Sequence, residues 1–329
     1  MTLKDVAREA NVSVAAASYA MRDSGTVSRE MREHVREVAA RLGYRPNRSA
    51  QAVRMGRNTT LGLLLPDLRN PYFPALAQSL EHEARRAGYT VMLIDTSGAA
   101  ESEIDGMRHL ENQGVAGAIW CRTSNAEHLE ALPHFAMPVA VIGTPDAGYD
   151  NVTTRDLEGG RQLARHLIDH GHRSLGLITS ADIMEGKDDR KIGFLAEAEG
   201  KAKIGWQVQT SYAVHLPQYV FEKLKERSVT AVMCGNDMIA IGVLRAAHEL
   251  GLRVPDDLSV VGFDDISWAS IVVPALTTVR QPVDQMAASA MTLLLNRLAE
   301  PERRIRHYKV DVRLISRQSV ATIPAAAAN

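Results

Sequence analysis

The sequence has little of what a membrane protein, an exported protein or a disulfide-stabilised protein needs. No uninterrupted apolar run approaches the roughly 18 residues of a membrane-spanning helix. The first residues, MTLKDVAREANV, carry charges and no apolar stretch, unlike a signal peptide. Cys121 and Cys234 lie far apart in apolar segments and cannot form a disulfide framework or a zinc knuckle. We therefore expect a cytoplasmic protein without a membrane partner.

Motifs of the common enzyme classes are also missing from the sequence. There is no G-x-S-x-G elbow, no G-x-x-x-x-G-K-[ST] phosphate loop and no G-x-G-x-x-G after a strand. The aspartate pairs at 188–189, 256–257 and 264–265 are adjacent, and neighbouring side chains do not face each other on a helix. We expect a protein that is not an enzyme and that has no cofactor.

Length and charge indicate a small basic domain followed by a larger acidic one. A chain of 329 residues is long enough for two or three domains, and 45% hydrophobic with 23% charged residues is ordinary for a globular protein. Residues 1–60 have a net charge of +5, whereas the remainder has −6. This asymmetry predicts a polyanionic partner for the first part alone, the alternative being an ordinary solvated surface.

The first forty-five residues predict three helices. Apolar residues at helical spacing begin at Leu3, and Ser13 stands as the N-cap of a second helix that runs to about Arg22. Asn11 supplies the positive φ that a tight turn between two helices requires. The arrangement is that of a helix-turn-helix.

A third helix is expected from the N-cap Ser28 to Gly43, with an apolar side made of Met31, Val35, Val38, Ala39 and Leu42. Pro46 then interrupts the chain, and a short helix over 48–55 is too short to persist alone in water.

From Thr60 onward, apolar strand-like runs alternate with amphipathic helices, for example at 72–87 and 237–250. Such alternation predicts parallel sheets with helices on both faces. The expected strands are TLGLLLP, YTVMLID, VAGAIW, PVAVIG, SLGLIT, TAVMCG and LSVVGF.

Several of these segments together resemble the LacI/GalR family of bacterial transcription regulators. They are LKDVAREANVSVAAAS, VSREMREHVREVAARLGYRPN, LGLLLPDLRNPYF, HLIDHGHRSLGLI, AVMCGNDMIAIGVLRAAHELGLRVPDDLSVVGFDD and PALTTVRQP. The resemblance implies an all-α helix-turn-helix head at 1–46, a hinge at 47–57 and an α/β body at 58–329. The body would have two doubly wound, periplasmic-binding-protein-like lobes. Lobe one would comprise about 58–170 and 281–310, and lobe two about 171–280 and 311–323.

In this family the second helix reads DNA bases in the major groove. The matching positions are Val14 and Ala15, with Tyr19 one turn later, where the family usually has arginine. Tyrosine offers one hydroxyl and a ring and cannot hold a guanine with two bonds, so we expect an operator unlike the usual family sequence. Ser13 and Ser18 are expected to contact phosphates.

The hinge residues Asn47, Arg48 and Val53 are expected to bind DNA as well. Val53 stands where the family inserts a leucine between base pairs of the minor groove. The alternative for Val53 is a small buried contact between two hinge helices.

The resemblance and the strand ends together predict an effector site between the lobes, because ligands bind at the carboxyl ends of parallel strands. Arg190 in RKIGF matches the arginine that holds the effector in the family, and Asp237 is expected to cap the next helix rather than to bind ligand. Arg155 would add a second positive charge from lobe one, unless it pairs with Asp156 or Glu158 outside the site. The expected effector residues are Tyr72, Phe73, Arg155, Arg190, Asn236, Asp264 and Gln281.

His166, His170 and His172, with Asp169 between them, have a spacing that a metal site could use. Histidines at two of these positions are ordinary in the family, so we expect no metal here.

The sequence therefore predicts a homodimeric transcriptional repressor that binds double-stranded, pseudo-palindromic operator DNA. Its affinity would be controlled by a small-molecule effector, a sugar or sugar derivative and, given Arg155, one that carries an acidic group. The alternatives are an activator or dual regulator that responds to a non-sugar metabolite such as a purine, and a stand-alone sugar-binding protein, which would lack the basic head.

Overall fold

The computed structural model describes residues 1–21, 27–44, 58–122, 135–143, 148–180, 188–211 and 213–324. The chain forms two compact units, residues 1–59 and 60–329. No helix within the described ranges is long and apolar enough to cross a lipid bilayer.

The described part of the first unit contains three helices, α1 (Leu3–Glu9), α2 (Val14–Met21) and α3 (Arg29–Arg41). They enclose a small core of alanine and valine side chains that includes Val6, Ala17 and Val35. Alanines on α2 let the three helices approach closely, which suits a unit with so few residues to bury.

The helix boundaries in the head depend on the capping residues that the sequence predicts. The Ser13 hydroxyl accepts a hydrogen bond from the Ala16 amide at 3.1 Å. Ser28 is the N-cap of α3, and Asn11 and Gly43 adopt φ values of 54° and 63°. These predictions are confirmed, because each helix begins or ends where an orphan backbone group finds a partner or the chain turns left-handed.

The expected core of α3 needs one correction. Val35, Val38 and Ala39 are buried, and Leu42 packs against them. Met31 is 37% exposed, because it lies in the first turn of α3, beyond the end of the small core.

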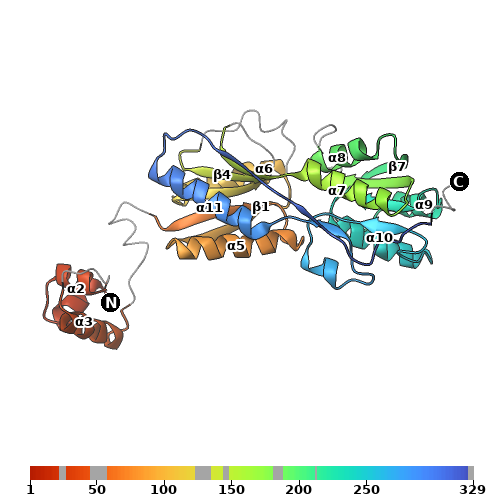
Figure 1. Cartoon of the computed structure of the whole chain (residues 1–329). Helices are drawn as coiled ribbons and strands as arrows, with labels where there is room; N and C mark the ends of the chain where they lie inside the picture. Colours follow the sequence, from red (N-terminus) through yellow and green to blue (C-terminus); the bar gives the residue numbers. More distant parts are fainter. Residues whose placement is uncertain are drawn as a thin grey trace. The chain divides into compact units, whose positions relative to one another are not determined.

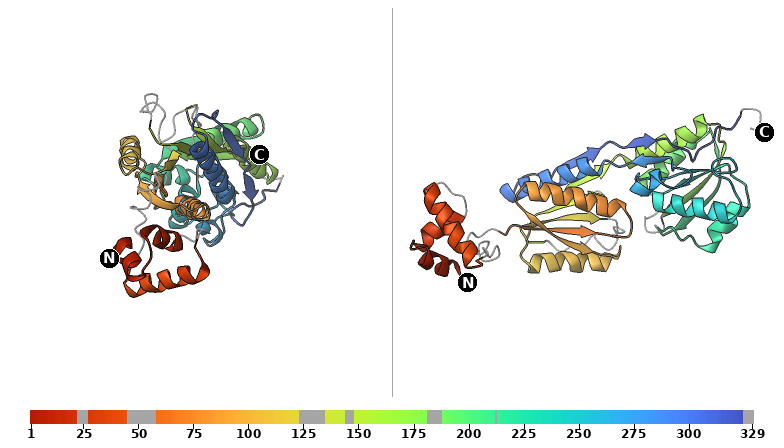
Figure 2. Two further views of the ribbon diagram at one scale, coloured as in Figure 1. Left: turned by 90° about the vertical axis from the view of Figure 1, so that its left-hand side faces the viewer. Right: turned by 90° about the horizontal axis from the view of Figure 1, so that it is seen from below.

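Lobe one of the second unit has a six-stranded sheet in the order β11-β5-β4-β3-β1-β2, with every pairing parallel. Helices α5 and α11 pack on one face of this sheet and α6 on the other (Figures 1 and 2). The elements are β1 (Thr60–Leu65), α5 (Tyr72–Arg86), β2 (Thr90–Asp95), α6 (Ala100–Asn112), β3 (Gly117–Arg122), β4 (Val139–Gly143), β5 (Asp150–Thr154), α11 (Val283–Ala299) and β11 (His307–Val310).

Lobe two has a four-stranded parallel sheet in the order β7-β6-β8-β9. Helices α7 and α8 cover one face, and α9 and α10 cover the other. The elements are α7 (Asp156–Asp169), β6 (Ser174–Ser180), α8 (Asp189–Ala198), β7 (Lys203–Thr210), α9 (Gln218–Lys225), β8 (Ala231–Cys234), α10 (Asp237–Glu249), β9 (Ser259–Val261) and the 3₁₀ helix η2 (Ser267–Ser270). The strands β10 (Thr278–Arg280) and β12 (Arg313–Ile315) pair antiparallel beside it.

The boundary between the lobes differs from the expected one. Helix α7 was expected in lobe one, but its Leu163 and Leu167 share a core with Leu177 and Phe194 of lobe two. The chain therefore crosses between the lobes directly after β5, and again after β10 and after β11. The family resemblance implied a boundary near 170, whereas the apolar side of α7 packs on the sheet of lobe two.

Two glycines bring α7 and α8 into backbone contact. A Cβ on Gly160 would lie 2.0 Å from the Arg190 carbonyl oxygen, and a Cβ on Gly193 would lie 1.9 Å from the Leu157 carbonyl oxygen. Any larger side chain would push the helices apart, together with Asp156 at the start of α7 and Arg190 at the start of α8.

We expect Gly193→Ala to destabilise the body by about 1–3 kcal/mol, because the added methyl group overpacks a rigid backbone contact. In an unobstructed helix the same change would stabilise by roughly 1 kcal/mol. Guanidinium denaturation followed by tryptophan fluorescence measures this, because Trp120, Trp206 and Trp268 all lie in the body.

The matched control is Gly106→Ala in α6. Its Cβ would meet only methyl groups of Leu64 and Ile94, at 3.2 and 3.3 Å, which can shift slightly. Equal losses of stability in the two variants would contradict the proposed role of the α7–α8 contact.

Candidate functional site

The residues expected to read DNA share the exposed side of α2. Val14 is 38% exposed and Tyr19 41% exposed, and Ala15 is exposed beside them. The opposite side of the helix carries the buried Ala17 and Ala20. Helix α2 thus exposes a large aromatic ring and an apolar surface to solvent, while its buried alanines pack against the core of the head.

Ser13 and Ser18 lie at the margins of this exposed side. The Ser13 hydroxyl accepts the N-cap bond, and a hydroxyl that accepts can still donate its own hydrogen, for example to a phosphate oxygen. Asn47, Arg48 and Val53 of the expected hinge lie outside the described residues.

In the body, the Arg190 guanidinium lies between two carboxylates. Its Nε donates to Asp156 at 2.9 Å, and its Nη1 lies 3.3 Å from Asp264. Nη1 also donates to the Gly235 carbonyl oxygen at 2.8 Å. The guanidinium carbon lies 3.9 Å from the centre of the Phe263 ring, a cation–π contact. These contacts fix the arginine from four directions.

Further bonds close the cluster into a ring. Gln281 donates from Nε2 to Asp264 at 2.6 Å and accepts at Oε1 from the Tyr72 hydroxyl at 3.3 Å. The Thr154 hydroxyl lies 3.3 Å from the same Oε1 and also contacts Asp156. We call Tyr72, Thr154, Asp156, Arg190, Asp264 and Gln281 the polar ring.

The polar ring joins the two lobes, because its members lie at the ends of elements from both. Tyr72 begins α5 of lobe one, and Arg190 lies at the start of α8 of lobe two. Asp264 follows β9, and the remaining three members lie where the chain crosses between lobes, directly after β5 and after β10. These are carboxyl ends of strands, where open parallel sheets bind their ligands.

Asp264 is the most strained and most deeply buried acid of the ring. Its φ is 113°, outside the regions that non-glycine residues usually adopt. Burial raises the pKa of its carboxyl group to about 6, against the opposing effect of the Arg190 charge. Burial also raises the pKa of the Tyr72 hydroxyl well above its ordinary value, so this hydroxyl remains a neutral donor.

The cap of α10 differs from the expected one. Asn236, not Asp237, is the N-cap, and its side chain accepts from the Ile239 amide at 2.9 Å. Asp237 is the first helical residue and points into the core, where it accepts from the Ile266 amide and the Thr278 hydroxyl. Burial raises the pKa of the Asp237 carboxyl group well above its ordinary value.

Three of the expected effector residues lie outside the polar ring. Asn236 caps α10, and Phe73 packs against the core of lobe one with its ring edge-on to Tyr72. Arg155 pairs with Asp311 at 2.7 Å, and both side chains are largely exposed. The expected alternative for Arg155, an ion pair outside the site, is therefore correct in kind, although the partner is neither Asp156 nor Glu158.

Thr154 and Asp156 are the ring members that the sequence analysis did not select. Both lie at the first crossing between the lobes, and Asp156 stands beside Arg155, which was chosen for its unusual charge. A helix-initiating acid directly after a strand was the signal that could have identified Asp156.

The histidines at the end of α7 and just before β6 have structural contacts. The rings of His166 and His170 lie 4.2 Å apart, and His172 contacts the Thr230 hydroxyl and the Ala321 carbonyl oxygen. Within the described ranges, no group of three or more His, Cys, Asp and Glu side chains could hold a metal ion.

Asp264→Asn should change the pH dependence of stability. The pKa of this carboxyl group is about 6 in the folded chain and about 3.8 without burial. Below pH 3.8 the Asp264 carboxyl group is protonated in both the folded and the unfolded chain, so folding buries no charge there. Above about pH 6 the group is ionised in both, and the full penalty for burying its charge is present. Relative to the variant, the native protein should lose roughly 3 kcal/mol of unfolding free energy between pH 4 and 7.

Urea denaturation at several pH values measures this difference, and Asp257→Asn is the control. Hydrogen bonds from Arg253 lower the pKa of the exposed Asp257 to about 2. Its stabilisation is complete above pH 3.8 and lost only as the pH falls through about 2, so its difference should stay flat from pH 4 to 7. A flat difference for Asp264→Asn would contradict the prediction.

Comparison with known proteins identifies both units. Residues 2–47 match the family described as bacterial regulatory proteins, lacI family, and residues 164–320 match the periplasmic binding protein-like domain. The HTH-type transcriptional repressor PurR of Salmonella arizonae is 31% identical over 333 residues, covering 98% of each chain. The ribose operon repressor of Halalkalibacterium halodurans is 31% identical over 320 residues, covering 97% of this chain and 96% of that one.

Solved structures agree in fold. A LacI family transcriptional regulator from Enterococcus faecium with bound ribose is 26% identical, with a TM-score of 0.72, and covers 80% of this chain and 100% of its own. The lac repressor dimer bound to operator and the anti-inducer ONPF has a TM-score of 0.86 at 24% identity, covering 98% and 99% of the two chains. The head and the two parallel-sheet lobes agree with the resemblance found in the sequence, and so do relatives that match from end to end. The chain therefore belongs to the LacI family of bacterial regulatory proteins.

Proposed function

We propose that this protein is a homodimeric, sequence-specific transcriptional repressor whose affinity for operator DNA is controlled by a small metabolite at the polar ring. The observation that carries the proposal is that one polar ring, with Tyr72, Asp264 and Gln281 buried and the other members partly buried, joins both lobes. A ligand that exchanges bonds with the ring would favour one arrangement of the lobes over another, and differential binding of this kind is what shifts a conformational equilibrium.

The head supports the DNA-binding part of the proposal. Its α2 exposes Val14, Ala15 and Tyr19 on one side, which fits a recognition helix that contacts base edges. One such helix covers only a half-site, so we expect two chains to bind a pseudo-palindromic operator. Relatives named as repressors, and a lac repressor solved as a dimer on its operator, support this expectation.

The charges of the polar ring favour a neutral, hydroxyl-rich effector. One guanidinium faces two carboxylates, so the ring offers more acceptors than positive charge. Arg155, on which the expectation of an acidic effector rested, is engaged with Asp311. Vicinal hydroxyls can donate to a carboxylate and accept from an arginine at once, as sugars do. Solved relatives with bound ribose or D-xylulofuranose support this chemistry.

The polar ring gives less support to a purine effector. A planar base would stack on an exposed aromatic face, but the Arg190 guanidinium covers the aromatic face of Phe263. The hydroxyl of Tyr72 is already bonded to Gln281.

Tyr19→Ala should change which bases the protein prefers. The tyrosine is the largest exposed side chain of α2, and one base contact is worth about 1–3 kcal/mol of discrimination. Selection from a random pool of duplexes should return a site altered at one position in each half. In contrast, Arg48→Ala should weaken binding to all sequences alike, and an unchanged selected site for Tyr19→Ala would contradict the assignment.

Arg190→Ala should weaken effector binding by at least about tenfold, or about 1.4 kcal/mol, because its fork cannot be replaced. A thermal-shift screen of neutral sugars, sugar acids, phosphorylated sugars and purines finds the ligand, and calorimetry measures the variants. Arg155→Ala, which removes an equal charge outside the ring, should change the affinity by less than about twofold. An acidic ligand that depends on Arg155 would contradict the neutral-effector proposal, and normal binding by Arg190→Ala would contradict the site.

A further inference from the structure

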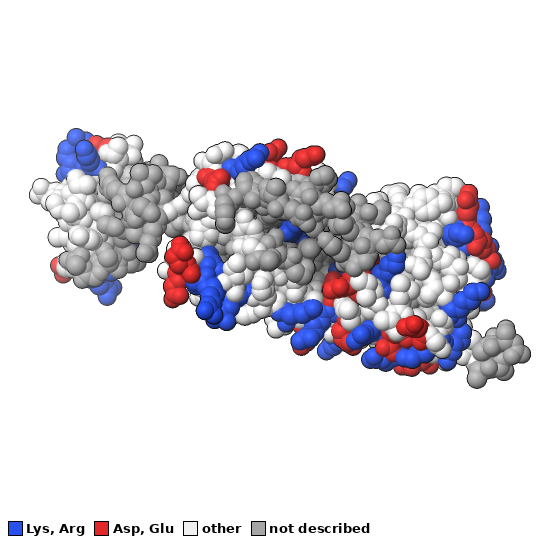
Figure 3. Space-filling model, turned by 90° about the horizontal axis from the view of Figure 1, so that it is seen from above, with Lys and Arg blue, Asp and Glu red and all other residues white. Residues whose placement is uncertain are grey.

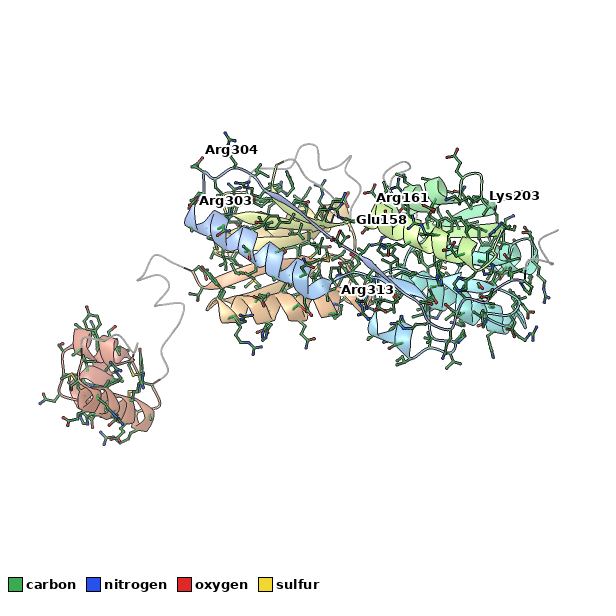
Figure 4. All side chains as sticks on the ribbon, viewed as in Figure 1. Glu158, Arg161, Lys203, Arg303, Arg304 and Arg313 are labelled. Carbon is green, nitrogen blue, oxygen red and sulfur yellow. The ribbon has the colours of Figure 1, made fainter. Side chains whose placement is uncertain are left out.

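The loop between α11 and β11, residues 300–306, lies at the edge of lobe one where the chain from the head enters. All six strands of this sheet are parallel, so they begin at one edge. Thr60 begins β1 at this edge, and Arg306 precedes β11 at the same edge. Figure 4 shows Arg303 and Arg304 at this end of the lobe.

A buried ion pair holds this loop in shape. Arg297 of α11 donates from Nε to Asp150 at 3.0 Å, and the Asp150 side chain is inaccessible to solvent. The same guanidinium donates to the carbonyl oxygens of Pro301 and Arg303, and Asp150 accepts from the Arg306 amide at 2.7 Å. The loop backbone is therefore fixed, and fixed backbone reduces the entropy lost when its side chains bind a partner.

The loop carries three arginines and two glutamates, Glu300 and Glu302, and so has a net charge of +1. Arg304 and Arg306 are exposed and Arg303 is half-buried. No described carboxylate forms an ion pair with any of the three, whereas Arg85 and Arg86, at the end of α5, pair with Glu81 and Glu83.

The net positive charge of the loop is opposite in sign to that of the body as a whole. Residues 61–329 have a net charge of −6. Figure 3 shows basic and acidic side chains side by side over much of lobe two and also at the end of lobe one where the chain enters. An anionic partner would therefore meet net repulsion from the body as a whole, and attraction only where it can reach the arginine side chains of this loop.

We propose that the loop of Arg303, Arg304 and Arg306 binds phosphates of the DNA that flanks the operator. The inference rests on the proposed function. Guanidinium groups match the oxygens of a phosphate with two parallel bonds, and they are more weakly hydrated than ammonium groups. The chain from the head enters the body at Thr60, which begins β1 at the same edge as the loop. The loop extends the binding surface beyond the bases that α2 reads.

The test compares two duplexes that carry the site selected by the full-length protein from a random pool. One is trimmed to about 20 base pairs, two half-sites, and the other is extended to about 60. Fluorescence anisotropy at several salt concentrations gives the slope of log Kd against log salt for each. The variant is Arg303→Ser/Arg304→Ser/Arg306→Ser. The matched control, Arg161→Ser/Lys203→Ser/Arg313→Ser, removes three cations of lobe two, labelled in Figure 4.

For the native protein, the longer duplex should give a slope steeper by about 2–3, since each phosphate contact contributes about 0.9. The loop variant should lose this difference and bind the short duplex with native affinity, whereas the control should keep the difference. Near physiological salt, the advantage of the longer duplex should fall about sixfold when the salt concentration is doubled.

A loop variant that keeps the flank-dependent slope would overturn the inference alone, and so would an equal loss in the control. Such a result would leave an acidic protein as the partner to consider. Failure of the native protein to select any site would instead overturn the proposed function, and this inference with it.

Discussion

The arrangement of the body depends on one positive charge shared by two carboxylates that are shielded from water. Arg190 is 15% exposed, Asp156 23% and Asp264 5%. Removing one partner would leave a charge uncompensated, which is far more costly than replacing all three groups together by apolar ones of similar volume. The three side chains therefore constrain one another. Through them, the crossing after β5, the start of α8 and the loop after β9 keep fixed positions relative to one another.

Packing makes this charge cluster possible. Gly160 and Gly193 let α7 and α8 touch backbone to backbone, which brings Asp156 within hydrogen-bonding distance of Arg190. Phe263 serves both parts of the arrangement, because its ring packs against Gly159 on one side and receives the guanidinium on the other. Two glycines on α7 and one on α8 therefore determine where Asp156 and Arg190, which connect the lobes, are placed.

Much of this could be predicted from the sequence, and the exceptions have physical causes. Caps and turns are local, so Ser13, Ser28, Asn11 and Gly43 marked the head correctly. Continuous apolar runs likewise marked seven strands, β1 to β4, β6, β8 and β9. Strands β5, β7, β10, β11 and β12 were not predicted. Strands β5 and β7 read as mixed polar and apolar, and β7 is an edge strand that alternates between exposed and buried positions. Arg155, which was predicted to bind the effector, lies outside the polar ring, whereas the neighbouring Asp156 lies in it. One position along the start of a helix turns a side chain by about 100°, and periodicity alone does not say which side faces the partner lobe.

The members of the polar ring already bond to one another, and this decides what kind of ligand can bind to them. Arg190 already has two carboxylates and a carbonyl oxygen as acceptors. An anionic ligand would have to displace a carboxylate that has no other cation among the described ring members, and the displaced charge would remain buried. A hydroxyl pair can insert between Arg190 and Asp264 by accepting from one and donating to the other, so that neither charge loses a partner. The side chain of Gln281 can follow such a change, since its amide both donates and accepts. Because Gln281 begins the return of the chain to lobe one, a ligand that re-pairs the ring acts directly on the connection between the lobes.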